Sequence, residues 1–116
     1  MELNIRHFDI WLANLNPQRG TEIGKVRPIL IVQTNLINNL SDSTLICPVT
    51  SKTSQSEITK VKIDPSAENG LKSKSWVIVD QIRSIDNRRL IRKLGTLSMG
   101  NRTSIRRSLK IILDLE

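Results

Sequence analysis

Several residue types are scarce in this chain, and their scarcity limits the chemistry that the protein can perform. Its 116 residues include one Cys, one His, one Phe and no Tyr. A lone cysteine, Cys47, cannot form an internal disulfide, and it fits a reducing cytoplasm. One cysteine and one histidine, with acidic residues that show no ligand spacing, argue against a catalytic zinc or two-metal site. We therefore expect no metal and no other cofactor.

Longer patterns are missing as well. No apolar run approaches membrane-spanning length, and Glu2, Asn4 and Arg6 interrupt the start of the chain, where a signal peptide would be apolar. We expect a cytoplasmic protein without a membrane partner. The glycine patterns of P-loop and Rossmann sites are absent, and a serine–histidine triad has no local support. Aromatic residues make up only 3%, which argues against RNA binding by rows of bases stacked on a sheet.

Positive charge is what the chain does have. Lys and Arg number 18 against 11 Asp and Glu, so the formal net charge is +7 and the sequence pI is about 10.2. Such a balance indicates polyanionic partners, either nucleic acid or an acidic protein. The alternative is a basic surface that only faces water.

The most informative segment is the Gly- and charge-rich stretch 17–28, which leads into the apolar run 29–32. Pro28 fixes its own φ and pushes Arg27 toward extended conformations, so the backbone aims the arginine from both sides. A pre-aimed guanidinium beside a basic loop is suited to binding phosphate. The apolar run itself predicts a strand that is covered on both faces.

Hydrophobic periodicity predicts several short strands and one helix. The strands are expected over residues 8–15, 29–32, 44–49, 58–63, 76–82 and 90–97. Residues 35–40 are expected to form a single helical turn, and Gly95 to mark a bulge or bend. Ser98 can cap a helix that starts at Met99. The pattern predicts one domain over residues 1–116, mainly β, as a small barrel with a C-terminal α-helix.

The predicted helix carries two stripes. Its apolar stripe is expected to pack on the barrel or on a second subunit, and it comprises Ile105, Leu109, Ile112 and Leu113. Its basic stripe is expected to be solvated, with phosphate contact as the alternative, and it comprises Arg102, Arg106 and Lys110.

Polar side chains near the predicted strand ends are the other candidates for chemistry, because neighbouring strand ends in a barrel can converge on one rim. Besides Arg27 they are Glu22, Thr50, Ser51, Asp80, Gln81 and Arg83. Each also has a structural interpretation: Thr50 and Ser51 form a common strand-to-loop transition, and residues 80–83 could make an internal salt bridge with a turn. Cys47 is expected to be a small buried hydrophobic residue, and His7 an exposed structural histidine at the start of the first strand.

Several short motifs follow one another along the chain between Phe8 and Leu97. They are Phe8-Asp9-Ile10-Trp11, Leu15-Asn16-Pro17, Gly20-Thr21-Glu22, Gly24-Lys25-Val26-Arg27-Pro28, Pro48-Val49-Thr50-Ser51, Asp80-Gln81-Ile82-Arg83 and Arg89-Leu90. Together they resemble the MazF/PemK family of toxin endoribonucleases. The resemblance implies an SH3-like β barrel, a homodimer, an acidic antitoxin that blocks the site, DNA binding by the antitoxin complex, and metal-independent cleavage of single-stranded RNA, often mRNA.

The resemblance also implies roles for individual residues. The family's catalytic pair maps onto Arg27 and Thr50, and the possible catalytic or site-shaping residues are Glu22, Ser51 and Asp80. The expected RNA-binding residues are Lys25, Lys52, Gln81 and Arg83. The chain departs from the family at Phe8, where a glycine is usual, and at Ile78, where some members place a catalytic arginine.

In the implied reaction, the 2′-OH of the RNA attacks the neighbouring phosphate and leaves a 2′,3′-cyclic phosphate and a 5′-OH. The stretch 20–24 is expected to act as a gate over the site. Two alternatives remain. One is a toxin of the same fold that binds a protein, like the gyrase poison CcdB, although the chain ends without the C-terminal Trp of that family. The other is a non-catalytic SH3-like RNA-binding module.

Overall fold

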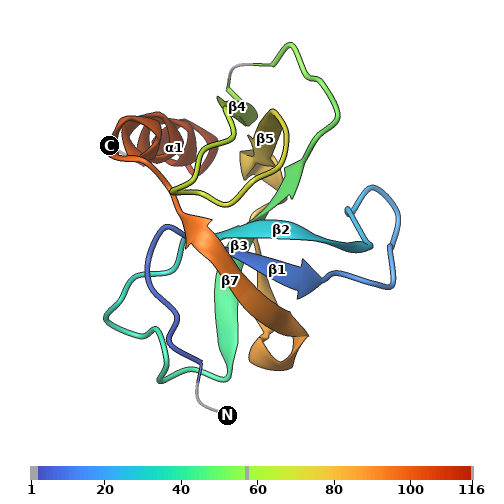
Figure 1. Cartoon of the computed structure of the whole chain (residues 1–116), viewed down its shortest axis with the longest axis vertical. Helices are drawn as coiled ribbons and strands as arrows, with labels where there is room; N and C mark the ends of the chain where they lie inside the picture. Colours follow the sequence, from blue (N-terminus) through green and yellow to red (C-terminus); the bar gives the residue numbers. More distant parts are fainter. Residues whose placement is uncertain (1–2, 57, 116) are drawn as a thin grey trace.

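A computed structural model describes residues 3–56 and 58–115 of the chain. In chain order the elements are β1 (Asp9–Asn14), β2 (Val26–Ile31), β3 (Ser43–Thr50), β4 (Lys60–Ile63), β5 (Ser75–Ile78), the 3-10 turn η1 (Val79–Gln81), β6 (Arg83–Asp86), the 3-10 turn η2 (Asn87–Arg89), β7 (Leu90–Thr96) and α1 (Met99–Ile112). The strands pair antiparallel in the order β4-β5-β3-β2-β1-β7, and β6 pairs with β3 (Figure 1).

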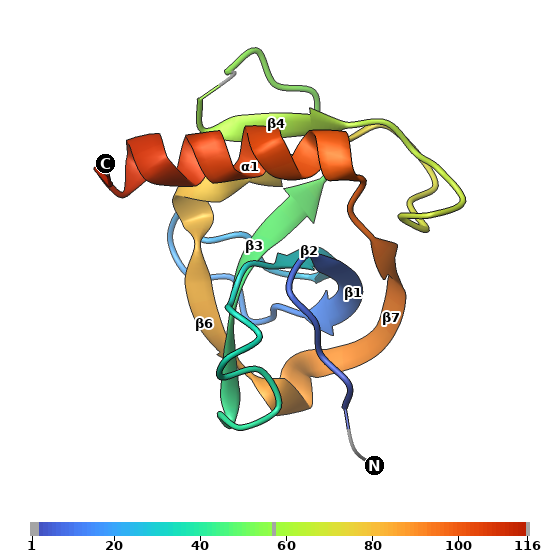
Figure 2. The same cartoon turned by 90° about the vertical axis from the view of Figure 1, so that its left-hand side faces the viewer.

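The expected class, mainly β with a C-terminal helix, is confirmed. The sheet curves strongly, but within the described residues it does not close into a full barrel, because β4 and β7 stand at the two ends of its hydrogen-bonded order. Helix α1 lies across the β4 end of the sheet (Figure 2) and packs on β4 and η1.

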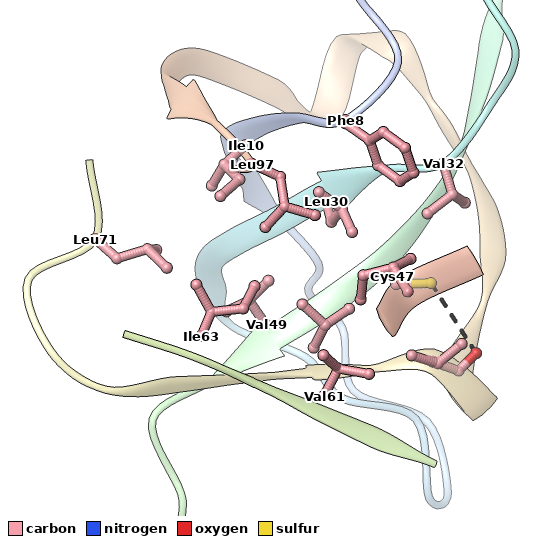
Figure 3. Close-up of a cluster of buried hydrophobic side chains, with 13 residues drawn as sticks. Phe8, Ile10, Leu30, Val32, Cys47, Val49, Val61, Ile63, Leu71 and Leu97 are labelled. Atoms are coloured by element: carbon pink, nitrogen blue, oxygen red, sulfur yellow. Dashed lines mark hydrogen bonds between the residues drawn. The ribbon is translucent and has the colours of Figure 1, made fainter. Parts of the chain in front are cut away.

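Two hydrophobic clusters cover opposite faces of the central strands. The larger one includes Leu30 and Cys47 (Figure 3). Ile105 of α1 belongs to the same cluster. The smaller one includes Ile29 and Ile31. Since all of these β2 side chains are fully buried, the prediction of a strand covered on both faces is confirmed.

The predicted strand over residues 76–82 is wrong in its second half. The strand ends at Ile78, a 3-10 turn occupies Val79–Gln81, and the chain then resumes as β6 beside β3. Strand β3 advances three residues from Val49 to Ile46, while its neighbour advances six from Val77 to Arg83. The three extra residues form the turn, and its first residue, Val79, continues the apolar run of β5. This turn is where the Asp-Gln motif lies.

Helix α1 follows the predicted start, and its apolar stripe packs on the sheet. The Ser98 hydroxyl accepts a hydrogen bond from Asn101 N at 3.3 Å. Ile105 is fully buried and Leu109 packs on the larger cluster, whereas Leu113 is exposed. The apolar stripe therefore belongs mainly to this chain's own core.

The basic stripe is mainly solvated, as expected: Arg106 and Lys110 are exposed, and Arg102 is half-buried. The guanidinium carbons of Arg102 and Arg106 lie over the Phe8 ring, 5.3 and 4.9 Å from its centroid. Phe8 itself has a φ of 68°, a left-handed conformation that glycine adopts without strain. The departure from the family at this position thus adds a fully buried ring beneath two arginines.

Smaller corrections concern element ends. β2 begins at Val26 and β4 at Lys60, and residues 35–40 form consecutive turns. Gly95 lies beside a bulge, as predicted: Ile10 pairs with Gly95 but Trp11 with Lys93, which leaves an extra residue in β7.

Candidate active site

A basic cavity of about 860 Å³ lies where β2 begins and β3 ends. Among the described residues, none that lines it is acidic, and five are cationic: Lys25, Arg27, Lys52, Lys72 and Arg92. Thr50 and Ser51 line the same cavity. Such a concentration of positive charge favours a polyanionic ligand.

Arg27 is the half-buried cation of this group. Its Nε donates to Gly24 O at 2.7 Å, and among the described residues neither of its Nη groups has a hydrogen-bond partner. Because Nε is tied to the loop, the guanidinium presents its two Nη groups as an end-on pair. Partial burial lowers the pKa of Arg27 from its ordinary value, yet an arginine remains charged in proteins.

Thr50 comes to the same place from β3. The β2–β3 register sets Ile29 opposite Pro48, two residues before Thr50 in β3 and two after Arg27 in β2, and the side chains of Arg27 and Thr50 line the same cavity. The Thr50 hydroxyl oxygen accepts from Lys52 N at 3.1 Å, so its hydrogen remains available to donate to a ligand. The neighbouring Ser51 is exposed on the cavity wall.

A smaller hollow of about 310 Å³ adjoins the first and shares Thr50 and Lys52 with it. Asp80 and Gln81 reach this hollow from η1, and Lys60 from β4. Asp80 is exposed. The 3-10 turn that the sequence did not predict therefore carries these two residues to the rim.

Gln81, Glu22 and Arg83 lie together in a different arrangement from the one expected. The Gln81 amide is hydrogen-bonded to the backbone of the 15–25 loop, and Glu22 makes an ion pair with Arg83 at 2.8 Å. Glu22 and Arg83 line a separate hollow of about 430 Å³. The ion pair thus ties Glu22 and its loop to β6.

Sequence reasoning missed two of the five cations, Lys72 and Arg92. They reach the cavity because the 64–74 loop packs directly on β7, backbone to backbone. A Cβ on Gly70 would lie 2.1 Å from Leu94 O, and one on Gly95 2.3 Å from Glu68 O. Gly70 and Gly95 were the sequence signal for this close packing, but the residues they pack against are about 25 positions away in the sequence.

The remaining reactive side chains lie elsewhere. Cys47 is buried in the larger cluster, and burial, with a smaller contribution from Asp80, raises the pKa of its thiol to about 12 (Figure 3). His7 is half-buried rather than exposed, and its Nδ1 lies 3.2 Å from Gln33 O. Within residues 3–56 and 58–115, no three His, Cys, Asp or Glu side chains form a group that could hold a metal ion. The described residues also contain no helix long and apolar enough to span a bilayer.

Comparison with known proteins identifies the family. Residues 6–113 match the sequence profile of the PemK-like, MazF-like toxins of type II toxin-antitoxin systems. The chain belongs to this family. The match spans the strands that build the cavity and all of α1.

Solved structures agree with this assignment. The Mycobacterium tuberculosis toxin MazF-mt6 is 25% identical, with 93% of this chain and 98% of that chain covered and a TM-score of 0.78. MazF from Deinococcus radiodurans is also 25% identical, with 96% and 97% covered and a TM-score of 0.81. An endoribonuclease from a mycobacterial species, solved with its cognate antitoxin, is 20% identical, with 97% and 98% covered and a TM-score of 0.79; it shows the shared fold.

Proposed function

We propose that this PemK/MazF-family protein is a metal-independent endoribonuclease that cleaves single-stranded RNA at a short sequence and thereby inhibits translation and growth. The observation that carries the proposal is the cavity lined by five cations and, among the residues that the structure describes, by no acid, with Arg27 and Thr50 on its wall. RNA supplies its own nucleophile, the 2′-OH beside each phosphodiester. The protein needs to align that hydroxyl and stabilise the charge that develops on the phosphate.

Arg27 is assigned to charge stabilisation. As the 2′-oxygen bonds to phosphorus and the bond to the 5′ oxygen breaks, negative charge grows on the non-bridging oxygens. The Nη pair of Arg27 donates to these oxygens, and its partial burial strengthens the interaction. The products are a 2′,3′-cyclic phosphate and a 5′-OH, and the leaving 5′ oxygen takes up a proton.

Thr50 is assigned to orientation. Its hydroxyl oxygen is occupied by Lys52 N, so its hydrogen donates to the phosphate and fixes the rotation of that group. Asp80 and Ser51 lie on the adjacent walls and shape the site. The residue that removes the 2′-OH proton is not assigned.

An acidic antitoxin and a homodimer complete the proposal. The basic cavity is complementary to an acidic peptide segment, which would compete with RNA for the same charges. The last turn of α1 and the residues after it expose Ile111, Leu113 and Leu115, an apolar surface that suits a second subunit. Type II toxins of this kind would act in the cytoplasm, where mRNA is translated.

Replacing Arg27 is the direct test. Arg27→Ala removes the donors to the developing charge, so we expect the cleavage rate of single-stranded RNA to fall on the order of 10²–10³-fold. Arg27→Lys should also be slow, because an ammonium group cannot donate through a planar pair. Gel-based cleavage rates at saturating RNA check both.

Arg107→Ala is the matched control. It removes one positive charge from α1 at a hollow that Arg27 does not line, and should leave the rate within about threefold of wild type, as expected for an exposed surface position. Cleavage by Arg27→Ala at close to the wild-type rate would remove Arg27 from the site.

The salt dependence of RNA affinity tests the lysines on the cavity wall. Lys25 and Lys52 are exposed and are assigned to phosphates that flank the cleaved bond. For single strands, each neutralised phosphate contributes about −0.7 to the slope of log affinity against log salt concentration. Each Lys→Ala variant should therefore flatten the slope by about that amount, measured by fluorescence anisotropy. Slopes equal to that of wild type would place the RNA elsewhere.

A further inference from the structure

One amide side chain, Gln81, ties the middle of the 15–25 loop to the body of the protein. Its Oε1 accepts a hydrogen bond from Ile23 N at 2.9 Å, and its Nε2 donates to Thr21 O at 2.9 Å. These contacts join residues 58 and 60 positions apart in the sequence. Both ends of the amide are thus engaged by the loop backbone, which leaves it poorly placed to read RNA.

The anchor for this amide is rigid. Gln81 ends η1, which packs on α1, β3 and β4. At the start of the turn, Val79 is fully buried, its N donates to Thr59 O at 2.8 Å and its O accepts from Ile82 N at 3.2 Å. The side chain of Gln81 therefore projects from a turn whose backbone is tied to the core.

The loop passes this constraint on to Arg27. Gly24 follows Ile23, and Gly24 O is the acceptor for Arg27 Nε at 2.7 Å. On its other side, Lys25 N donates to Asn16 Oδ1 at 2.7 Å. The peptide that orients the guanidinium is therefore held from Gln81 on one side and from Asn16 on the other.

We propose that Gln81 is a positioning residue, which holds the Arg27 guanidinium in its reactive orientation through Ile23 and Gly24. The inference rests on the proposed function, since the rate that it controls is RNA cleavage. Charge stabilisation depends on donors that are already in place, and a displacement of about 1 Å can lower a rate by about 10²-fold. Without Gln81, Gly24 O moves with the loop and Arg27 loses its orientation.

The loop has a second tie, the ion pair between Glu22 and Arg83. The Glu22 side chain is 50% exposed, and exposed ion pairs restrain a chain weakly because solvent screens them. The two ties hold the same loop with different chemistry. They allow a comparison in which one variant cuts the amide tie and the other cuts the ionic tie.

The experiment compares wild type, Gln81→Met and Glu22→Gln, each nearly isosteric. Three quantities are measured: the single-turnover cleavage rate, the Kd for the same RNA with a 2′-deoxyribose at the mapped cleavage site, and the exchange rate of Arg27 Nε–H with water in ¹⁵N spectra. Thermal unfolding checks that each variant is folded.

Gln81→Met should cleave about 10–100-fold more slowly, with Kd within about threefold and Arg27 Nε–H exchange at least about tenfold faster. Glu22→Gln should show a smaller loss. A rate within about twofold of wild type, or unchanged Nε–H exchange, would overturn the inference, and a rise in Kd alone would make Gln81 an RNA contact. If the wild-type protein cleaves no RNA, the proposed function is wrong. The exchange rates of Arg27 Nε–H would then still show whether Gln81 holds Arg27.

Discussion

The two loops at opposite ends of β2 are both held by amide side chains, but in different surroundings (Figure 1). In the β2–β3 loop, residues 32–42, the buried side chains of Gln33 and Asn38 bond to each other at 3.0 Å. Gln33 Oε1 also accepts from Leu45 N, and Asn38 donates to Gln33 O. These contacts are local and hidden from water.

In the β1–β2 loop, residues 15–25, the side chains at positions 16–22 are exposed, and the ties run to a distant 3-10 turn through Gln81. Exposed hydrogen bonds exchange readily with water and stabilise little, whereas buried ones are costly to lose. The β2–β3 loop thus contributes to stability. The β1–β2 loop instead sets the orientation of Arg27, at little cost to the fold if it opens.

The largest expected effect is on the β1–β2 loop. A Cβ on Gly24 would lie 2.7 Å from Gln18 Cβ and 3.0 Å from Gln18 N, so Gly24→Ala must displace backbone. Since Gly24 O orients Arg27, we expect cleavage to slow by about 10²-fold with a smaller effect on stability. Cleavage rates and thermal unfolding of the same sample measure the two effects.

Gly100→Ala is the control for that substitution. A Cβ on Gly100 meets nothing within 4 Å, and the residue lies in α1. It should leave cleavage unchanged and stabilise the protein by roughly 0.5–1 kcal/mol. If Gly24→Ala unfolds the protein but cleaves normally when folded, the contrast between the two loops fails.

The middle effect is on the β2–β3 loop. Asn38→Ala leaves the buried amide of Gln33 without its partner, so the unfolding free energy should drop by about 1–3 kcal/mol. The cleavage rate per folded molecule should not change. Leu36→Ser, at a neighbouring position that is 82% exposed, should stay within about 0.5 kcal/mol of wild type in urea unfolding.

The smallest expected effect is on the pH dependence of stability, through the contact of His7 with the β2–β3 loop. Burial, with smaller effects from Arg106 and Arg102, lowers the pKa of His7, whose neutral ring bonds to Gln33 O. A depressed pKa means that stability is full above the unfolded value of about 6.5 and declines as the pH falls through the folded pKa. His7→Gln should remove this part of the decline between pH 7.5 and 5.5, seen as a smaller shift in Tm. Equal shifts would show that His7 does not contribute.

Much of the fold follows from local patterns in the sequence. Burial on both faces makes β2 a continuous apolar run, and Ser98 marks the start of α1 because a cap is a local interaction. The break at Val79 left no such signal, because Val79 continues the apolar run of β5 into the turn and no Gly or Pro marks it. Strands β5 and β6 both pair with β3, with three extra residues between them. This pairing depends on long-range contacts, which hydrophobic periodicity does not encode.

The sequence predicted the motifs of the candidate site but not the contacts between its residues. Arg27, Thr50, Lys25 and Lys52 share one cavity, as strand ends on one rim should. The contacts of Gln81 join residues about 60 positions apart, and a sequence gives no means to tell a base-reading amide from one that holds a loop. The roles of these residues in cleavage remain predictions.

The most direct test of the central claim is incubation of the wild-type protein with a defined single-stranded RNA in excess EDTA, followed by mapping of the new ends. The proposed site predicts undiminished cleavage that leaves a 2′,3′-cyclic phosphate and a 5′-OH, and no cleavage where the nucleotide before the bond is 2′-deoxy. RNA that stays intact, or cleavage that EDTA abolishes, would contradict it.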